Sequence, residues 1–258
     1  MKKSLIICAD DLGLSHGINC AILKCFQENL VTLTTIIPTA PFFEEGVSFV
    51  LRNHIPCGVH LTIATEFDRS PMRPLLKNTP TTPDGFLYPN VFPYIEDAAL
   101  EQVYHEFCAQ IEKVYRAGIQ PTHIDSHIHV YSEPILDQLG HKYNLPVRDK
   151  LELHPNKFGS LFHLTTAGNT VAEKIQAVKS FIMALPSTQN VIVAHPTGGL
   201  AEIQQCVSPS FPGRYYWQTE LRFQDIECLR AVRWQYLLQN QTISLDYRLE
   251  VRNGGNYP

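Results

Sequence analysis

Residues 7–19 read ICADDLGLSHGIN, so an apolar run leads directly into Asp10 and Asp11 and then into a helix-like pattern. Two adjacent carboxylates at the mouth of a buried strand repel each other and lose hydration, so a nearby group must compensate them. The stretch predicts a strand over residues 4–9, a loop that carries the acids and a helix from residue 17. The alternative is that the two acids serve as a helix N-cap and a first-turn carboxylate.

The same alternation continues along the chain outside this stretch. Strand-like segments at 31–40, 57–64, 120–131, 145–149, 189–199 and 242–248 are separated by helix-like segments at 42–53, 99–117, 134–144, 171–185 and 222–239. Strands that alternate with helices favour a parallel sheet covered by helices. We therefore expect an α/β fold in which residues 1–258 form one domain, a single TIM-like (β/α) barrel with room for an irregular or incomplete set of strands.

Composition narrows the class of partner. The chain has 258 residues, a net charge of -4 and scattered Lys and Arg, which argues against nucleic acid and anionic membranes. The apolar run at residues 5–9 is too short for a signal-peptide core or a membrane span, so we expect a soluble, cytoplasmic protein. The seven cysteines lack a C-x-x-C pair and are expected to be reduced and mostly buried. The composition favours a small or neutral partner over a charged polymer.

Polar residues collect where the predicted strands end. In a parallel barrel these ends converge on one face of the molecule, which is where catalytic groups lie. Side chains far apart in the sequence are thus expected to share one site: Asp10, Asp11, His60, the 123–129 cluster, Arg148 and His195.

The segment THIDSHIHVY, residues 122–131, carries the strongest signal. Residues two apart on a strand point the same way, which puts His123, Asp125, His127 and His129 on one face. Imidazoles with a carboxylate suit Zn²⁺ or another divalent transition metal, and an open octahedral site also permits Mg²⁺ or Mn²⁺. A polar or pH-sensitive histidine cluster is the alternative.

The remaining candidates have plain alternatives. His60 in an apolar strand could be a hydrogen-bonded core residue. His195, at the end of the apolar strand before PTGG, could be a general acid or could cap the next element. Arg148 could orient a carboxylate or a substrate oxygen, or could form a surface salt bridge.

Taken together and in this order, ADDLGLSHGIN, GVHLT, PTHIDSHIHV, LPVR and AHPTGG resemble the YdjC-like carbohydrate deacetylases, which include the chitooligosaccharide deacetylases. The resemblance covers nearly the whole chain. It implies a (β/α) barrel of the glycoside hydrolase/deacetylase kind. It also implies one divalent metal ion, Mg²⁺ or Zn²⁺, held by an Asp and two His, and removal of acetyl groups from N-acetylated sugars.

Carried over position by position, the resemblance implies a metal site and a catalytic set. The implied metal ligands are Asp11, His60 and His127. Asp10 becomes the general base, His195 the acid that protonates the leaving amine, and Arg148 the group that steadies the base. His123, Asp125 and His129 are left beside the ligands or facing substrate.

Two departures from the family pattern bear on the shape of the pocket and hence on the substrate. CADDLG stands where many relatives have Asn before the acids and Phe after them, and the Pro-Gly pairing after His195 is missing. The sugar, mono- or short oligosaccharide such as a chitooligosaccharide, and its phosphorylation are left open. So are another metal-dependent hydrolase on the same barrel and a non-catalytic metal- or sugar-binding protein. Residues 65–93 and the aromatic stretch at 206–218 are expected to line the pocket or, for the latter, to form an oligomer interface such as a homodimer.

Overall fold

The structure is a computed structural model that describes residues 3–65, 72–88, 97–127, 133–154, 157–185, 189–198, 216–232 and 243–249. Parts of the predicted pocket segments 65–93 and 206–218 therefore lie outside the described residues. His129 lies outside them entirely. No helix in the described part of the chain is long and apolar enough to cross a membrane. Six cysteines are described; none of them forms a disulfide, and all but Cys20 are buried.

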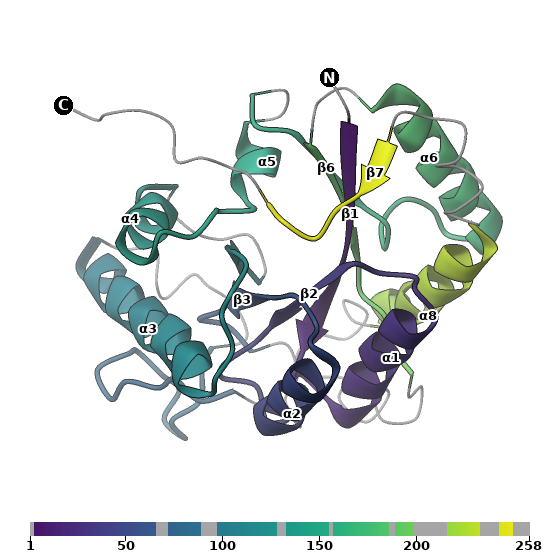
Figure 1. Ribbon diagram of the computed structural model, residues 1–258. Coiled ribbons are helices and arrows are strands. Elements are labelled where there is room, and N and C mark those ends of the chain that lie inside the picture. Colours follow the sequence, from purple (N-terminus) through teal and green to yellow (C-terminus); the bar gives the residue numbers. More distant parts are fainter. Residues whose placement is uncertain are drawn as a thin grey trace.

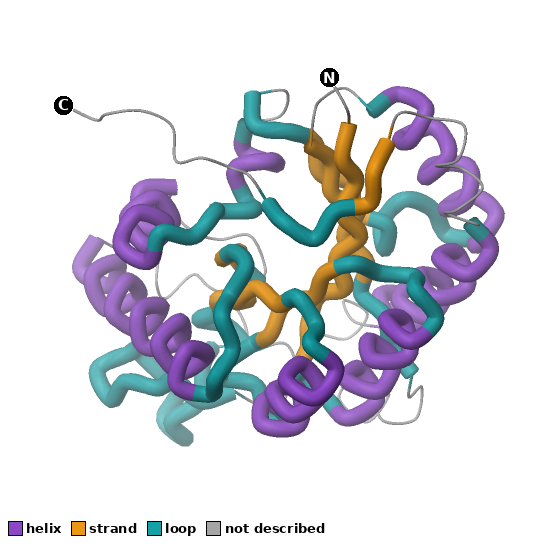
Figure 2. Tube along the Cα trace, in the orientation of Figure 1, coloured by secondary structure: helices purple, strands orange, loops and turns teal. Residues whose placement is uncertain are grey.

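A parallel sheet forms the centre of the molecule (Figures 1 and 2). Its strands are β1 (Lys3–Leu12), β2 (Leu33–Ile36), β3 (Cys57–Leu61), β4 (Ile124–Ser126), β5 (Ser160–His163), β6 (Gln189–Ala194) and β7 (Ile243–Leu245). They are ordered β4-β3-β2-β1-β6-β5, and β7 pairs with the start of β1. Every pairing is parallel, as the alternation of strands and helices predicts.

The helices surround this sheet (Figure 1). They are α1 (His16–Gln27), α2 (Phe43–Asn53), α3 (Asp97–Arg116), α4 (Glu133–Tyr143), α5 (Lys150–Leu153), α6 (Val171–Ala184) and α8 (Tyr216–Ala231). Helices α1 and α3 pack on β1 and β3, and α6 packs on α8. The described strands β4 and β5 are the two open edges of the sheet, so the architecture is a half-barrel and not the closed TIM barrel.

The two faces of the sheet have separate apolar clusters. On β1, Leu5, Ile7 and Ala9 belong to the large cluster beneath the helices. Ile6 and Cys8 belong to a smaller cluster on the inner face of the half-barrel. Because side chains on a strand alternate between faces, Asp10 follows Ile6 and Cys8 onto the inner face. By the same rule, Asp11 would point into the helical layer.

A β-bulge changes the direction of Asp11. The register between β1 and β2 shifts between Ala9 and Leu12, so that β1 holds one extra residue there. Asp11 takes a φ of 77°, in the left-handed region that non-glycine residues rarely adopt. After the bulge, Leu12 lies in the cluster beneath the helices. The bulge thus frees Asp11 from strand alternation, and both acids can face the same site.

Several sequence predictions need correction. β1 continues through both acids, which do not lie in a loop, and the N-cap of α1 is Ser15, whose hydroxyl accepts from Ile18 N–H, so the acids do not cap this helix. Residues 145–149 contribute only an isolated bridge at Val147 in place of a strand. The unpredicted strand β5 forms the opposite edge of the sheet, next to β6. Its residues are only half-buried, which weakens the apolar signal.

Substitution of Gly58 on β3 tests how tightly the inner face is packed against His123. A Cβ at this position would lie 2.2 Å from the imidazole of His123, which is fully buried. We expect Gly58→Ala to lower the free energy of unfolding by about 1–3 kcal/mol, the usual cost of overpacking. Chemical denaturation of Gly58→Ala, of His123→Ala and of the double variant would measure this. Equal costs of Gly58→Ala in both backgrounds would contradict the packing.

Candidate active site

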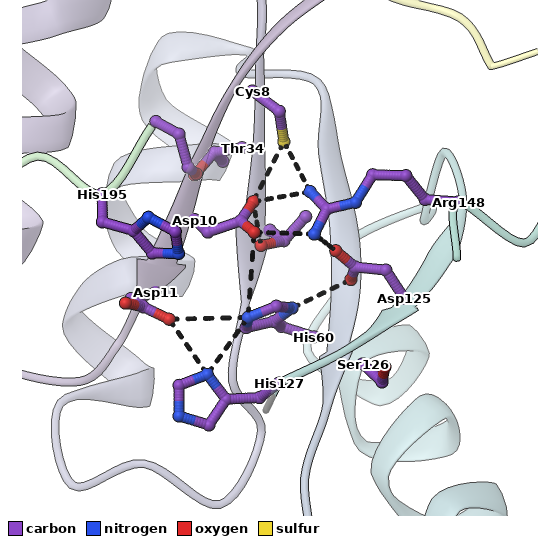
Figure 3. Close-up of polar contacts among 12 residues, drawn as sticks. Cys8, Asp10, Asp11, Thr34, His60, Asp125, Ser126, His127, Arg148 and His195 are labelled. Atoms are coloured by element: carbon purple, nitrogen blue, oxygen red, sulfur yellow. Dashed lines mark hydrogen bonds and ion pairs between the residues drawn. The ribbon is translucent and has the colours of Figure 1, made fainter. Parts of the chain in front are cut away.

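Four strand ends deliver polar side chains to one side of the half-barrel. The inner-face positions are Asp10 on β1, His60 on β3, Asp125 on β4, and His127 and His195 directly after β4 and β6. Figure 3 shows these side chains gathered together, with the imidazole of His195 pointing toward Asp10 and Asp11. The sequence expectation that distant strand ends share one site therefore agrees with the geometry.

Three donor atoms form a small triangle within the site. Asp11 Oδ1 lies 3.2 Å from His127 Nδ1 and 3.5 Å from His60 Nε2, and the two nitrogens are 3.2 Å apart. All three residues are buried. Asp11 Oδ1 accepts no hydrogen bond from the described residues although it is sealed from solvent. This buried oxygen has the two imidazole nitrogens as its neighbours, so it is placed to share a cation with them.

The spacing of the triangle matches a metal ion. Nitrogen and oxygen atoms bound to one tetrahedral Zn²⁺ at about 2.0–2.1 Å lie about 3.3 Å from each other. Two imidazoles and one carboxylate are also a donor set that divalent transition metals prefer. The residues present therefore fit a metal ion, and they are the three that the sequence resemblance implied: Asp11, His60 and His127.

Asp125 lies behind His60 and holds its ring. Asp125 Oδ1 accepts a hydrogen bond from His60 Nδ1 at 3.0 Å, which leaves Nε2 directed at the triangle. Carboxylate–histidine pairs of this kind orient metal-binding imidazoles. Burial opposes a charge on His60, but Asp125 and Asp10 raise its pKa well above the ordinary value. His60 is thus both a buried core residue and a member of the site.

Asp10 is held by Arg148 in a two-pronged ion pair. Arg148 Nη1 donates to Asp10 Oδ1 at 2.7 Å and Nη2 donates to Oδ2 at 2.6 Å. Nη2 also forms an ion pair with Asp125. Burial would raise the pKa of Asp10, but Arg148 and His60 hold it well below its usual range. Arg148 is buried, so the surface salt bridge considered from the sequence is wrong.

Two neighbours complete the surroundings of Asp10. Thr35 Oγ1 donates to Asp10 Oδ1 at 3.1 Å, and Cys8 Sγ donates to the same oxygen at 3.2 Å. Asp10 Oδ2 lies 3.9 Å from His60 Nε2, so this oxygen faces the triangle. Asp10 therefore stays ionised beside the candidate metal site and is fixed in direction.

Sequence reasoning missed Arg222, which binds the second oxygen of Asp11. Arg222 Nη1 on α8 donates to Asp11 Oδ2 at 2.7 Å, and both side chains are buried. Burial would raise the pKa of Asp11, but Arg222 and His127 hold it well below its ordinary value. Arg222 leaves Oδ1 as the oxygen that faces the imidazoles. Nothing in the local pattern of RFQDIECLRA marks this arginine as inward-facing.

His123 lies one layer below this group. Its ring packs against Gly58, and Thr122 Oγ1 contacts its Nδ1 at 2.9 Å. Burial lowers its pKa to about 4, so the imidazole is neutral near pH 7. His123 shares the inner face with Asp125, as the two-residue spacing predicts, but it is not among the residues that converge on the triangle.

The fold and the site define an α/β protein with a half-barrel sheet and a buried Asp/His group at the carboxyl ends of its strands. The model of the YdjC-like protein family matches residues 4–231, and the chain belongs to this family.

Two curated relatives carry the name carbohydrate deacetylase. The one from Geobacillus stearothermophilus is 31% identical over 163 residues, which cover 61% of this chain and 64% of the relative. The one from Clostridium beijerinckii is 32% identical over 186 residues, covering 69% of this chain and 67% of the relative. The match to the first relative thus spans less than two thirds of its length.

Solved structures support the fold. A crystal structure from Enterococcus faecalis, described as a cellobiose-phosphate cleavage protein, has a TM-score of 0.76 and 24% identity and covers 96% of this chain and 98% of its own. A peptidoglycan N-acetylglucosamine deacetylase has a TM-score of 0.52 and 11% identity, covering 94% of this chain and 85% of its own. At these identities the similarity concerns the fold alone.

The triangle of donor atoms predicts a measurable metal affinity. We expect Asp11→Asn and His127→Ala each to weaken Zn²⁺ binding more than about 100-fold, because each removes one of three ligands. Equilibrium dialysis of metal-stripped protein followed by elemental analysis measures this. Glu106→Gln is the matched control, since Glu106 is also a buried carboxylate but binds the 75–79 loop. Equal Zn²⁺ content in all four proteins would contradict the assignment.

Proposed function

We propose that this chain is a metal-dependent hydrolase that removes the acetyl group from an N-acetylated sugar, built as one YdjC-like domain over residues 1–258. One observation carries the proposal: the donor triangle of Asp11, His60 and His127 lies directly beside Asp10, a second carboxylate held by Arg148. The names of the curated relatives support the reaction class. The donor set favours Zn²⁺ over Mg²⁺, because Mg²⁺ prefers oxygen ligands.

Amide hydrolysis needs an activated water and a stabilised oxyanion. The chemistry supplied by a bound divalent cation is Lewis acidity, which polarises an acetyl oxygen and lowers the pKa of water. Asp11, His60 and His127 would hold that cation. Arg222 on Asp11 and Asp125 on His60 keep two of these three ligands in place.

Asp10 would act as the general base. Its low pKa keeps it ionised, as a base must be, but also makes it a weak base on its own. It can therefore deprotonate water only where that water is acidified, which explains why Asp10 Oδ2 faces the donor triangle. Arg148 fixes the direction of the carboxylate and stabilises its charge before the proton arrives.

His195 would protonate the leaving amine. Its ring points toward Asp10 and Asp11 in Figure 3, and the residue is only half-buried, whereas the two carboxylates are fully buried. Burial lowers its pKa to about 3, so the ring is neutral near pH 7 and would act as an acid only after it takes up a proton during turnover, such as the one that Asp10 removes from water. Collapse of the tetrahedral intermediate would then release the sugar amine and acetate.

The described residues of this site argue against both alternative functions. A glycoside hydrolase uses one carboxylic acid that stays protonated near neutral pH. Arg148 binds both Asp10 and Asp125. Burial would raise the pKa of each carboxylate, but Arg148 and His60 lower it. A non-catalytic metal- or sugar-binding protein has no use for a base so placed. The cytoplasmic location and the homodimer expected from the sequence stay predictions.

Acetate release is the direct test. We expect release from at least one of N-acetylglucosamine, its phosphate esters, chitobiose and chitotriose, lost after chelation and restored by added Zn²⁺ or Mg²⁺. Enzymatic quantification of acetate measures this. Metal-loaded protein that releases no acetate from the whole panel would favour the binding protein, and release of shorter sugars in place of acetate would favour a glycoside hydrolase.

The two adjacent acids should differ in what their loss does. We expect Asp10→Asn to keep its bound metal while turnover falls about 10²–10⁴-fold, because only the proton acceptor is lost. Asp11→Asn should lose metal and turnover together. Metal analysis beside steady-state acetate kinetics separates the two, with thermal unfolding as the check on folding. Full activity in Asp10→Asn would show that the base is a different residue.

A further inference from the structure

A second buried polar network lies behind His195, apart from the donor triangle. It joins Thr165, which follows β5, to Lys174 on α6 and Asp225 on α8. Lys174 and Asp225 are both 0% exposed and form an ion pair at 2.5 Å. Helix packing alone does not require this network, because apolar residues of similar volume would serve as well.

The hydrogen bonds of Asp225 show which groups must be donors. Asp225 Oδ1 accepts from Lys174 Nζ, and Oδ2 accepts from the backbone N–H of His195 at 3.0 Å and from Thr165 Oγ1 at 2.5 Å. Lys174 Nζ also donates to the carbonyl oxygens of Thr165 and Leu221. A carboxylate with three donors around it acts as an acceptor only. The single hydroxyl hydrogen of Thr165 is therefore committed to Asp225.

This commitment determines the tautomer of His195. Thr165 Oγ1 lies 2.8 Å from His195 Nδ1. With its hydrogen on Asp225, Oγ1 can offer only a lone pair to the ring, so Nδ1 must carry a hydrogen. Neutral His195 then has its lone pair on Nε2. Asp225 holds the backbone N–H of His195, and Thr165 holds Nδ1 of its ring.

We propose that Thr165 is a positioning residue that, supported by Asp225 and Lys174, keeps His195 in the Nδ1–H tautomer and makes Nε2 the atom that exchanges protons with substrate. The inference rests on the proposed function for its catalytic consequence, since it assigns the donating atom of the predicted acid. The tautomer itself does not depend on any substrate.

The first arm of the test reads the tautomer directly. ¹⁵N NMR of protein labelled at histidine, with His195→Gln to assign the signals, should show a hydrogen on Nδ1 and a bare Nε2 near neutral pH. Thr165→Val keeps the branched shape but removes the hydroxyl, and should shift the ring toward the Nε2–H form. Thr165→Ser should restore the wild-type signals. A wild-type ring with its hydrogen on Nε2, or an unchanged ring in Thr165→Val, would overturn the proposal.

A matched control separates this role from loss of any buried hydroxyl. Thr79 Oγ1 also donates to a buried carboxylate, Glu106 Oε2 at 3.0 Å, and Thr79 is as buried as Thr165. Thr79→Val should leave the His195 signals unchanged. A shift of those signals in Thr79→Val equal to that in Thr165→Val would count against a specific action of Thr165.

The second arm measures catalysis in the metal-loaded protein. We expect Thr165→Val to lower kcat about tenfold or more with KM and metal content changed less than twofold, and Thr165→Ser to recover most of kcat. Wild-type protein with the Nδ1–H tautomer and no acetate release would refute the proposed function and leave the tautomer assignment standing. Acetate release that is equal in wild type and Thr165→Val would refute the catalytic part of this inference alone.

Discussion

The β-bulge at Asp11 is the constraint on which the site depends. Adjacent residues of a regular strand face opposite sides, so a strand cannot present two neighbouring carboxylates to one cleft. One extra residue and a φ of 77° at Asp11 bring both acids to the inner side of the half-barrel. The strained conformation costs about 1–3 kcal/mol. Arg222 on Asp11 Oδ2 and the backbone bond from Leu14 N–H to the Asp11 carbonyl help to hold it.

The bulge brings negatively charged carboxylates close together, and the surrounding elements neutralise their charge only in part. Asp10, Asp11 and Asp125 are three buried carboxylates, and among the described residues Arg148 and Arg222 are the two buried guanidinium groups that bind them. The remaining negative charge explains why the carboxylates outweigh burial and raise the pKa of His60. A proton and a divalent cation would compete for the same His60 Nε2, so metal binding at this site would be coupled to proton release.

The sequence predicted the alternation of strands and helices and the convergence of their ends, because both follow from hydrophobic period and from parallel topology. It did not predict the bulge, since a run of apolar residues followed by two acids looks the same whether the strand stops or continues. Arg222 and the Lys174–Asp225 pair were also missed, because each lies on a helix whose inward-facing side depends on which helices pack together. β5 was missed because its residues are only half-buried.

The unequal environments of Asp10 and Asp11 bear on which acid would bind metal and which would act as the base. Both oxygens of Asp10 accept from Arg148, and Cys8 and Thr35 add two more donors to Oδ1. A metal that took Asp10 as ligand would have to compete with all four. Asp11 gives only Oδ2 to an arginine and keeps Oδ1 turned toward two imidazole nitrogens. The carboxylate with an uncommitted oxygen is the better ligand, and the one locked in direction is the better base.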